Sequence, residues 1–157
     1  MITSYYITAE ASKIIIDESQ KSLTLENGGI LIGKFSNSCA IVRHAIGPGP
    51  KAQRSPHRFK RDGEFSQSEL DRYVKRSAGE FDYVGEWHSH PQYIGPSWVD
   101  LNSMAWIAAN PAYLVKNPLL LICSNTNREW IIECFLCADT KLNLLSRSIM
   151  RPQSSAS

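Results

Sequence analysis

The sequence lacks several features that would assign it to a broad class at once. No apolar run approaches the roughly 20 residues that a membrane span needs. The formal net charge is only +2, which is too small to indicate a nucleic-acid partner. The N-terminal stretch MITSYYITAE has no basic start followed by an apolar segment, so no secretory signal is expected. These absences favour a cytoplasmic protein without a membrane or nucleic-acid partner.

Cysteine is scarce, with four in the chain, and only Cys134 and Cys137 form a C-x-x-C pair. A structural zinc site normally needs a second such pair or matching histidines, and neither accompanies this one. The pair lies in the apolar run IIECFLCADT, which is typical of a buried strand. We therefore interpret both cysteines as core residues in a reducing compartment.

Internal repeats and long low-complexity segments are also absent. The length of 157 residues and a hydrophobic content of 43% suit one domain with a substantial core. We place this domain at residues 1–148. The remainder, 149–157, is a polar tail that we expect to be disordered.

Helical and strand patterns alternate along the chain, which predicts an α/β or α+β sheet domain with helices packed on it. The expected helices cover 9–21, where Thr8 would act as N-cap, 64–78 and 97–110. The expected strands cover 25–35, 39–46, 81–90, 118–124 and 128–137, the first two as a hairpin. The segment 141–149 is ambiguous between helix and strand.

A basic loop follows the hairpin and begins with alternating glycine and proline, GPGPKAQRSPHRFKRD. Its basic side chains include Arg54 and Arg58. The loop is either a solvated surface segment or a substrate-facing one that suits a polar or acidic partner, because long loops in compact domains are often functional.

Two histidines one residue apart, His88 and His90, end the strand predicted for 81–90. Residues i and i+2 of a strand point to the same face, so both imidazoles would project together, and Pro91 would stop the strand. The pair could share a metal ion, or it could simply end a strand that turns into the next helix.

The next segment, Ser97-Trp-Val-Asp100, has the pattern of a helix capping box. Such a helix start would hold the Asp100 carboxylate beside the end of the histidine strand. Two imidazoles, a carboxylate and an open position for water form a common catalytic zinc arrangement. Hydrolysis also needs a base, and the spacing does not choose between Glu26 and Glu86.

Together these pieces resemble the JAMM motif of the MPN (JAB) domain zinc metallopeptidases. The resemblance covers ENGGILIGKF from Glu26, then YVGEWHSHP, and then Ser97 to Asp100, and it extends from about Leu25 to Ala109. It is closest to the bacterial branch, which includes deconjugases of antiphage ubiquitin-like conjugation and CBASS systems. One departure is that six residues separate His90 from Ser97, where the family usually has seven.

The resemblance implies a fold like that of cytidine deaminases, with a mixed β-sheet between helices. It implies one catalytic zinc ion held by His88, His90 and Asp100. It also assigns Glu26 as the general base and Ser97 as the residue that helps stabilise the tetrahedral intermediate. Glu86 has no role in the motif, and Arg54 and Arg58 are candidate substrate-binding residues.

The implied activity is zinc-dependent cleavage after the C-terminus of a ubiquitin-like protein or another C-terminally conjugated protein, with operon-encoded conjugation enzymes as possible partners. One alternative is processing of the C-terminus of a sulfur-carrier protein. Another is a metal-free MPN scaffold that only binds partners. A zinc deaminase is disfavoured because its H-x-E and P-C-x-x-C motifs are missing.

Overall fold

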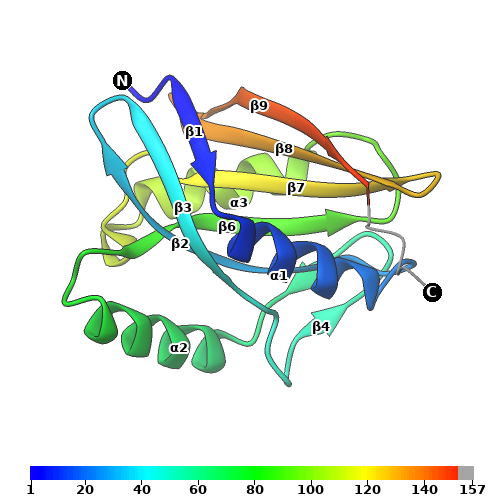
Figure 1. Ribbon diagram of the computed structural model, residues 1–157, viewed down its shortest axis with the longest axis horizontal. Helices are drawn as coiled ribbons and strands as arrows, with labels where there is room; N and C mark the ends of the chain where they lie inside the picture. Colours follow the sequence, from blue (N-terminus) through cyan, green and yellow to red (C-terminus); the bar gives the residue numbers. More distant parts are fainter. Residues whose placement is uncertain (152–157) are drawn as a thin grey trace.

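One curved, mixed β-sheet dominates the structure, a computed structural model that describes residues 1–151 (Figure 1). Its strand order is β1-β3-β2-β6-β7-β8-β9, with β1 parallel to β3, β6 parallel to β7, and all other neighbours antiparallel. The strands are β1 Ser4–Ile7, β2 Asn27–Ser36, β3 Cys39–Ile46, β6 Asp82–His90, β7 Leu119–Thr126, β8 Glu129–Ala138 and β9 Lys141–Met150. A separate two-stranded ribbon joins β4 Gln53–Arg54 to β5 Phe59–Lys60.

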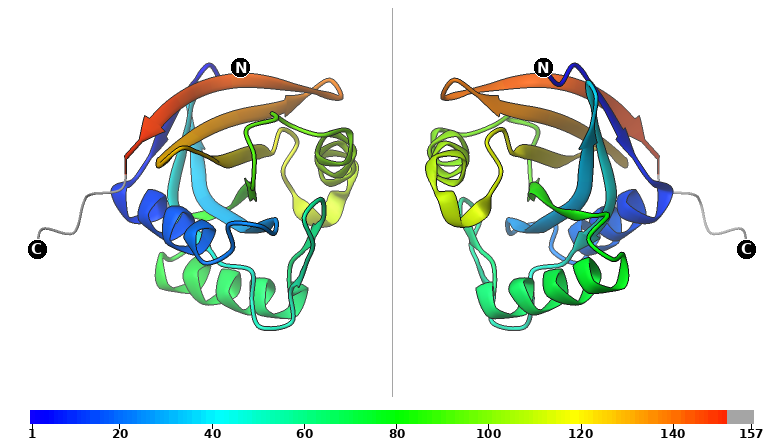
Figure 2. Two further views of the ribbon diagram at one scale, coloured as in Figure 1. Left: turned by 90° about the vertical axis from the view of Figure 1, so that its right-hand side faces the viewer. Right: turned by 90° about the vertical axis from the view of Figure 1, so that its left-hand side faces the viewer.

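Helices cover both faces of this sheet, so the expected mixed sheet between helices is confirmed (Figures 1 and 2). The helices are α1 Ala9–Gln20, α2 Gly63–Arg76 and α3 Trp98–Ala109, with a short 3-10 turn η1 at Pro111–Tyr113. Helix α1 buries Ala11 and Ile15 in a cluster with Trp87 on one face. Helices α2 and α3 cover the other face, where α3 contributes Met104 and Ile107.

Local sequence signals predict most of these elements. Thr8 caps α1 as expected, because its side chain accepts a hydrogen bond from the Ala11 amide. The ambiguous segment 141–149 is strand β9. Strand β1 and the β4–β5 ribbon were not predicted, since each strand has four residues or fewer and depends on a distant or irregular partner. The expected tail begins too early, because Ile149 and Met150 belong to β9, and its residues 152–157 lie outside the part that the structure describes.

The cysteines lie as the apolar pattern predicts. Cys134 and Cys137 are buried on β8, and no disulfide joins any of the four cysteines, all of which fall within residues 1–151. Burial raises the pKa of the Cys134 thiol well above its usual value. None of the helices described is long and apolar enough to cross a membrane.

The glycine pair at the start of β2 lets three strands approach one another closely. The Trp87 indole N–H donates a hydrogen bond to the Ile46 carbonyl at 2.9 Å, across the backbone of β2. A Cβ on Gly29 would lie 1.8 Å from that carbonyl oxygen, and a Cβ on Gly28 would lie 2.5 Å from the Trp87 carbonyl oxygen. The pair therefore forms a tight backbone passage that excludes any side chain.

Gly29→Ala should destabilise the fold by about 3 kcal/mol or more, because the clash is with backbone that cannot move without breaking the sheet. Urea unfolding of the purified variant measures the loss. Gly63→Ala is the matched control, since a Cβ at Gly63 would meet no atom within 4 Å, and it should be neutral or slightly stabilising. Equal stability of the two variants would contradict the packing argument.

Candidate metal centre

The pairing of β2 with β6 brings together residues that lie about sixty positions apart in the sequence. Asn27 pairs with Ser89, so Glu26 stands beside the end of β6, next to His90. The Asn27 backbone N–H donates a hydrogen bond to the Ser89 hydroxyl at 3.0 Å, which fixes this end of the pairing between β2 and β6. Glu26 Oε1 lies 3.9 Å from His90 Nε2.

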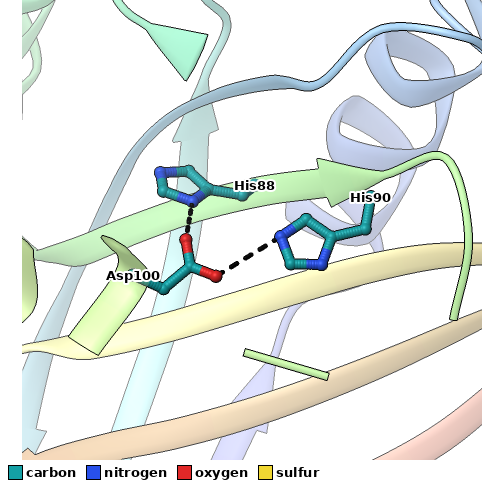
Figure 3. Close-up of side chains that lie close together, drawn as sticks. All are labelled: His88, His90 and Asp100. Atoms are coloured by element: carbon teal, nitrogen blue, oxygen red, sulfur yellow. Dashed lines mark hydrogen bonds and ion pairs between the residues drawn. The ribbon is translucent and has the colours of Figure 1, made fainter. Parts of the chain in front are cut away.

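His88, His90 and Asp100 converge at one point, as Figure 3 shows. Both histidines project from the same face of β6, as the strand spacing predicts. Asp100 Oδ1 lies 3.0 Å from His88 Nδ1, and Asp100 Oδ2 lies 3.5 Å from His90 Nε2. One potential ligand atom from each residue lies within 4.8 Å of the other two.

The expected capping box holds Asp100 in place at the start of α3. The Asp100 carboxylate accepts a hydrogen bond from the Ser97 amide at 2.7 Å, and the Ser97 hydroxyl accepts one from the Asp100 amide at 3.1 Å. The six-residue connection from Pro91 to Pro96 therefore does not disturb the helix start. Asp100 therefore caps the start of α3 and faces the two histidines at the same time.

Burial and neighbouring charges shift the acidity of these groups in opposite directions. Burial alone would raise the pKa of Asp100, but its hydrogen bonds with His88 and the Ser97 amide, and the His90 imidazole nearby, hold that pKa far below its usual range. Burial opposes protonation of His88, yet its bond to Asp100 outweighs this and raises its pKa. Burial raises the pKa of Glu26, with the histidines opposing this effect. Glu26 is thus more basic than an exposed carboxylate.

Glu86, the other carboxylate considered as a base, is engaged elsewhere. Its two oxygens accept hydrogen bonds from the Arg61 guanidinium at 3.2 Å each, and Tyr83 donates to it at 2.8 Å. The same guanidinium also reaches the Tyr113 hydroxyl at 3.2 Å. Glu86 therefore neutralises a half-buried arginine on the α2 side of β6.

A cleft of about 470 Å³ opens beside the convergent residues. Its lining includes Glu26, His88, Ser97 and Asp100, and also both candidate substrate-binding arginines, Arg54 and Arg58. His90 forms no part of this lining and is 2% exposed. The structure thus brings all the sequence-predicted site residues to one place, with His90 buried behind the others.

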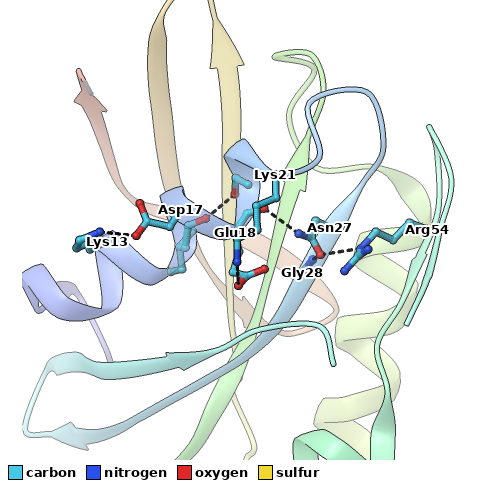
Figure 4. A network of polar contacts seen from close by, with 9 residues as sticks. Lys13, Asp17, Glu18, Lys21, Asn27, Gly28 and Arg54 are labelled. Atoms are coloured by element: carbon cyan, nitrogen blue, oxygen red, sulfur yellow. Dashed lines mark hydrogen bonds and ion pairs between the residues drawn. The ribbon is translucent and has the colours of Figure 1, made fainter. Parts of the chain in front are cut away.

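Arg54 has a structural contact as well as a position in the cleft (Figure 4). Its Nε donates a hydrogen bond to the Asn27 side-chain oxygen at 3.2 Å. The Asn27 side-chain nitrogen, Nδ2, donates one to the Glu18 backbone carbonyl at 2.9 Å. The amide of Glu26 itself donates to the Ser55 carbonyl at 2.9 Å. The basic loop is therefore attached to the segment that carries Glu26.

Some residues around the centre were not predicted from the sequence. Phe59 packs edge-on against His88, with ring centroids 5.9 Å apart. Tyr93 extends from the loop after β6 to Glu133 on β8, with 3.3 Å between its hydroxyl and the carboxylate. No local motif marks these residues, because their role depends on strands that meet only in the folded sheet.

The residues present fit a metal ion. Imidazole nitrogens and a carboxylate are common zinc ligands, and both nitrogens of His90 are buried without a hydrogen-bond partner among the described residues. A buried unpaired nitrogen is costly, and metal coordination would satisfy it.

The chain matches the family described as prokaryotic homologs of the JAB domain over residues 8–133. It belongs to this family. It is 27% identical over 143 residues to a Sinorhizobium fredii protein named probable metalloprotease y4qB, covering 89% of this chain and 87% of that one. It is 28% identical over 107 residues to an Escherichia coli protein named CD-NTase/cGAS isopeptidase, covering 68% of this chain and 65% of that one, just under two thirds.

A protein from Desulfitobacterium hafniense, solved in solution, has the same fold with a TM-score of 0.68. The two are 20% identical, and the match covers 89% of this chain and 88% of that one. Membership of the JAB family implies a bound metal ion, and His88, His90 and Asp100 are the residues whose side chains fit it.

Glu86→Gln should cost about 3 kcal/mol of unfolding free energy, because it leaves the Arg61 charge without its partner. It should not change metal affinity, since Glu86 points to Arg61 and Tyr83. Urea unfolding and metal titration measure the two quantities. Glu80→Gln, which removes an exposed partner of Lys34, is the control and should change stability by less than about 0.5 kcal/mol. Loss of metal affinity in Glu86→Gln would contradict this prediction and show that Glu86 contributes to metal binding.

Proposed function

We propose that this protein is a zinc-dependent isopeptidase or peptidase that cleaves after the C-terminus of a ubiquitin-like protein or another C-terminally conjugated protein. The observation that carries the proposal is the convergence of His88, His90 and Asp100 with Glu26 3.9 Å from His90, beside an open cleft. Relatives named metalloprotease and isopeptidase support the same class of reaction.

His88, His90 and Asp100 would hold the zinc ion. When bound, zinc acts as a Lewis acid that lowers the pKa of water and polarises the scissile carbonyl. Glu26 accepts the proton of the attacking water and delivers it to the leaving amine as the C–N bond breaks. The products are a free carboxylate and an amine, and no cysteine nucleophile is required.

Ser97 has a hydroxyl proton available for the carbonyl oxygen as water attacks and the tetrahedral intermediate forms. Its oxygen accepts the Asp100 amide hydrogen bond, so the O–H can donate to the developing oxyanion. The start of α3 thus positions both the Asp100 carboxylate and the Ser97 hydroxyl that donates to the oxyanion.

The proposed substrate class rests on the names of relatives. Several relatives from different bacteria carry the name CD-NTase/cGAS isopeptidase, which favours a conjugated protein over a sulfur-carrier protein. We therefore propose a role in bacterial antiphage defence, in the cytoplasm, where free buried cysteines remain reduced. The intact donor set argues against a metal-free scaffold, which would not need it.

Cleavage of a reporter fused to the C-terminus of a candidate ubiquitin-like protein or nucleotidyltransferase, encoded beside this protein, tests the proposal. Glu26→Gln should retain about one zinc per chain but lose about 10²–10⁴-fold in turnover, because it removes the proton acceptor. Glu64→Gln, an exposed carboxylate at the start of α2, is the matched control and should cut normally.

Equal cutting by wild type and Glu26→Gln would contradict the mechanism. Failure to cut any C-terminal fusion would contradict the deconjugase function. Cutting of a sulfur-carrier fusion alone would support the alternative substrate, and absence of stoichiometric zinc in the wild type would favour the scaffold.

We also propose that the β4–β5 ribbon and its arginines hold the extended tail of the substrate. An extended peptide can add a strand to an exposed ribbon edge, and both Arg54 and Arg58 face the cleft where the tail must pass. Their exposed charges suit an acidic or carbonyl-rich segment.

Arg58→Ala should lower kcat/KM about tenfold or more by removing one charge-assisted hydrogen bond, with little effect on stability because Arg58 is exposed. Arg54→Ala should combine that loss with a small destabilisation through Asn27. Lys51→Ala removes an equal charge from the same loop outside the cleft and serves as control. Unchanged cleavage kinetics in the double arginine variant would refute this role.

A further inference from the structure

Besides His90 Nε2, which faces Asp100, three buried polar atoms near the centre have no hydrogen-bond partner anywhere in the described chain. They are His90 Nδ1, Ser124 Oγ and Glu133 Oε1. Their residues are only 2%, 1% and 3% exposed. An unpaired polar atom at such depth costs free energy, so each one needs an explanation.

The sheet register places these three residues side by side on three adjacent strands. His90 on β6 pairs directly with Ser124 on β7. Ser124 pairs with Ile131 on β8, and Glu133 lies two residues further along that strand. Paired residues share a face and so do residues i and i+2, so all three side chains lie on the α3 side of the sheet. Glu133 is the diagonal neighbour of Ser124, within reach of its long side chain.

The hydrogen-bonding needs of the three atoms complement one another. His90 turns Nε2 toward Asp100, and Nδ1 lies on the other side of the ring (Figure 3). When Nε2 binds a metal ion, Nδ1 carries the proton and needs an acceptor. A serine hydroxyl both accepts and donates, and a carboxylate oxygen only accepts. The His90 Nδ1–H can therefore donate to the Ser124 hydroxyl oxygen, and the Ser124 O–H can donate to Glu133 Oε1.

Glu133 is itself held firmly. Its other oxygen, Oε2, accepts hydrogen bonds from Arg147 Nε at 3.0 Å and Nη2 at 2.7 Å, and lies 3.3 Å from the Tyr93 hydroxyl. The Arg147 guanidinium also lies over the Tyr93 ring, 5.9 Å from its centroid. Tyr93 belongs to the short connection between His90 and Ser97, so the same carboxylate anchors the loop at the edge of the site.

We propose that Ser124 and Glu133 are positioning residues that orient His90 as a metal ligand. None of the three atoms is bonded in the structure, so the chain from Nδ1–H to the Ser124 hydroxyl to Glu133 Oε1 forms when His90 binds the metal ion. This inference rests on the proposed metal site. This chain of hydrogen bonds selects one tautomer and one ring orientation of His90. It also connects the ligand to β8, β9 and the Pro91–Pro96 connection, none of which contains a metal ligand.

Ser124→Ala tests the chain by a readout other than activity. Its zinc affinity, measured by competition with a chelator, should fall about 10–100-fold, as is usual when an outer partner of a ligating histidine is lost. The free energy of unfolding of its metal-free form should not fall, because the variant deletes a buried hydroxyl that has no partner there.

Ser66→Ala is the matched control. Ser66 is also 2% exposed with an unpartnered hydroxyl, but it lies on α2, away from the histidines. Its zinc affinity should equal that of the wild type. If Ser124→Ala binds zinc as tightly as Ser66→Ala and wild type do, the inference is overturned while the proposed function stands. If the wild type binds no zinc, the proposed function itself fails.

Glu133→Gln tests the last link. It should weaken zinc binding less than Ser124→Ala, and the double variant should bind no more weakly than Ser124→Ala, since Glu133 Oε1 reaches His90 through the serine. The contacts of Oε2 with Arg147 and Tyr93 are either kept by the glutamine or lost equally in both backgrounds. Additive losses would overturn that link. Nitrogen-15 NMR of the zinc-loaded wild type should show the His90 proton on Nδ1, and a proton on Nε2 would contradict the chain.

Discussion

The antiparallel register between β2 and β6 is the constraint on which the rest of the site depends. It sets Asn27 against Ser89 and thereby Glu26 against His90. The register is held because Gly28 and Gly29 let β2 pass close to Trp87 and to the Ile46 carbonyl. A slip of one residue would send both histidines to the opposite face, so the packing of two glycines decides whether a catalytic arrangement exists at all.

The second requirement is a compact group of opposite charges that can remain buried. Asp100 faces His88 and His90 and also accepts a hydrogen bond from the Ser97 amide, so its pKa stays low although burial acts to raise it. The capping box makes this orientation part of the helix start. A local folding signal and the chemistry of the site therefore use the same carboxylate, which explains why a shorter preceding loop leaves the geometry intact.

Much of the fold follows from local patterns, because hydrophobic period and capping act within a few residues. Thr8 marked the first helix, and the apolar runs around Ile30 and Ile122 marked central strands. Strand β1 escaped prediction because four residues carry too little periodicity, and its pairing with β3 lies beyond a helix. The ribbon of β4 and β5 escaped because its sequence is basic and interrupted by proline, so only its partner strand defines it.

The sequence by itself determined the chemistry available at this site: two histidines on one strand face, a carboxylate at a helix start, and a motif that resembles a known family. It could not choose between Glu26 and Glu86 by spacing, since both carboxylates lie near a strand that carries histidines. The tertiary structure places the two carboxylates apart, because Arg61 binds Glu86 while the β2 register brings Glu26, which the resemblance assigns as the base, to His90. It alone also aligned Ser124 and Glu133 behind His90, since hydrogen-bond partners on neighbouring strands are set by register and not by distance along the chain.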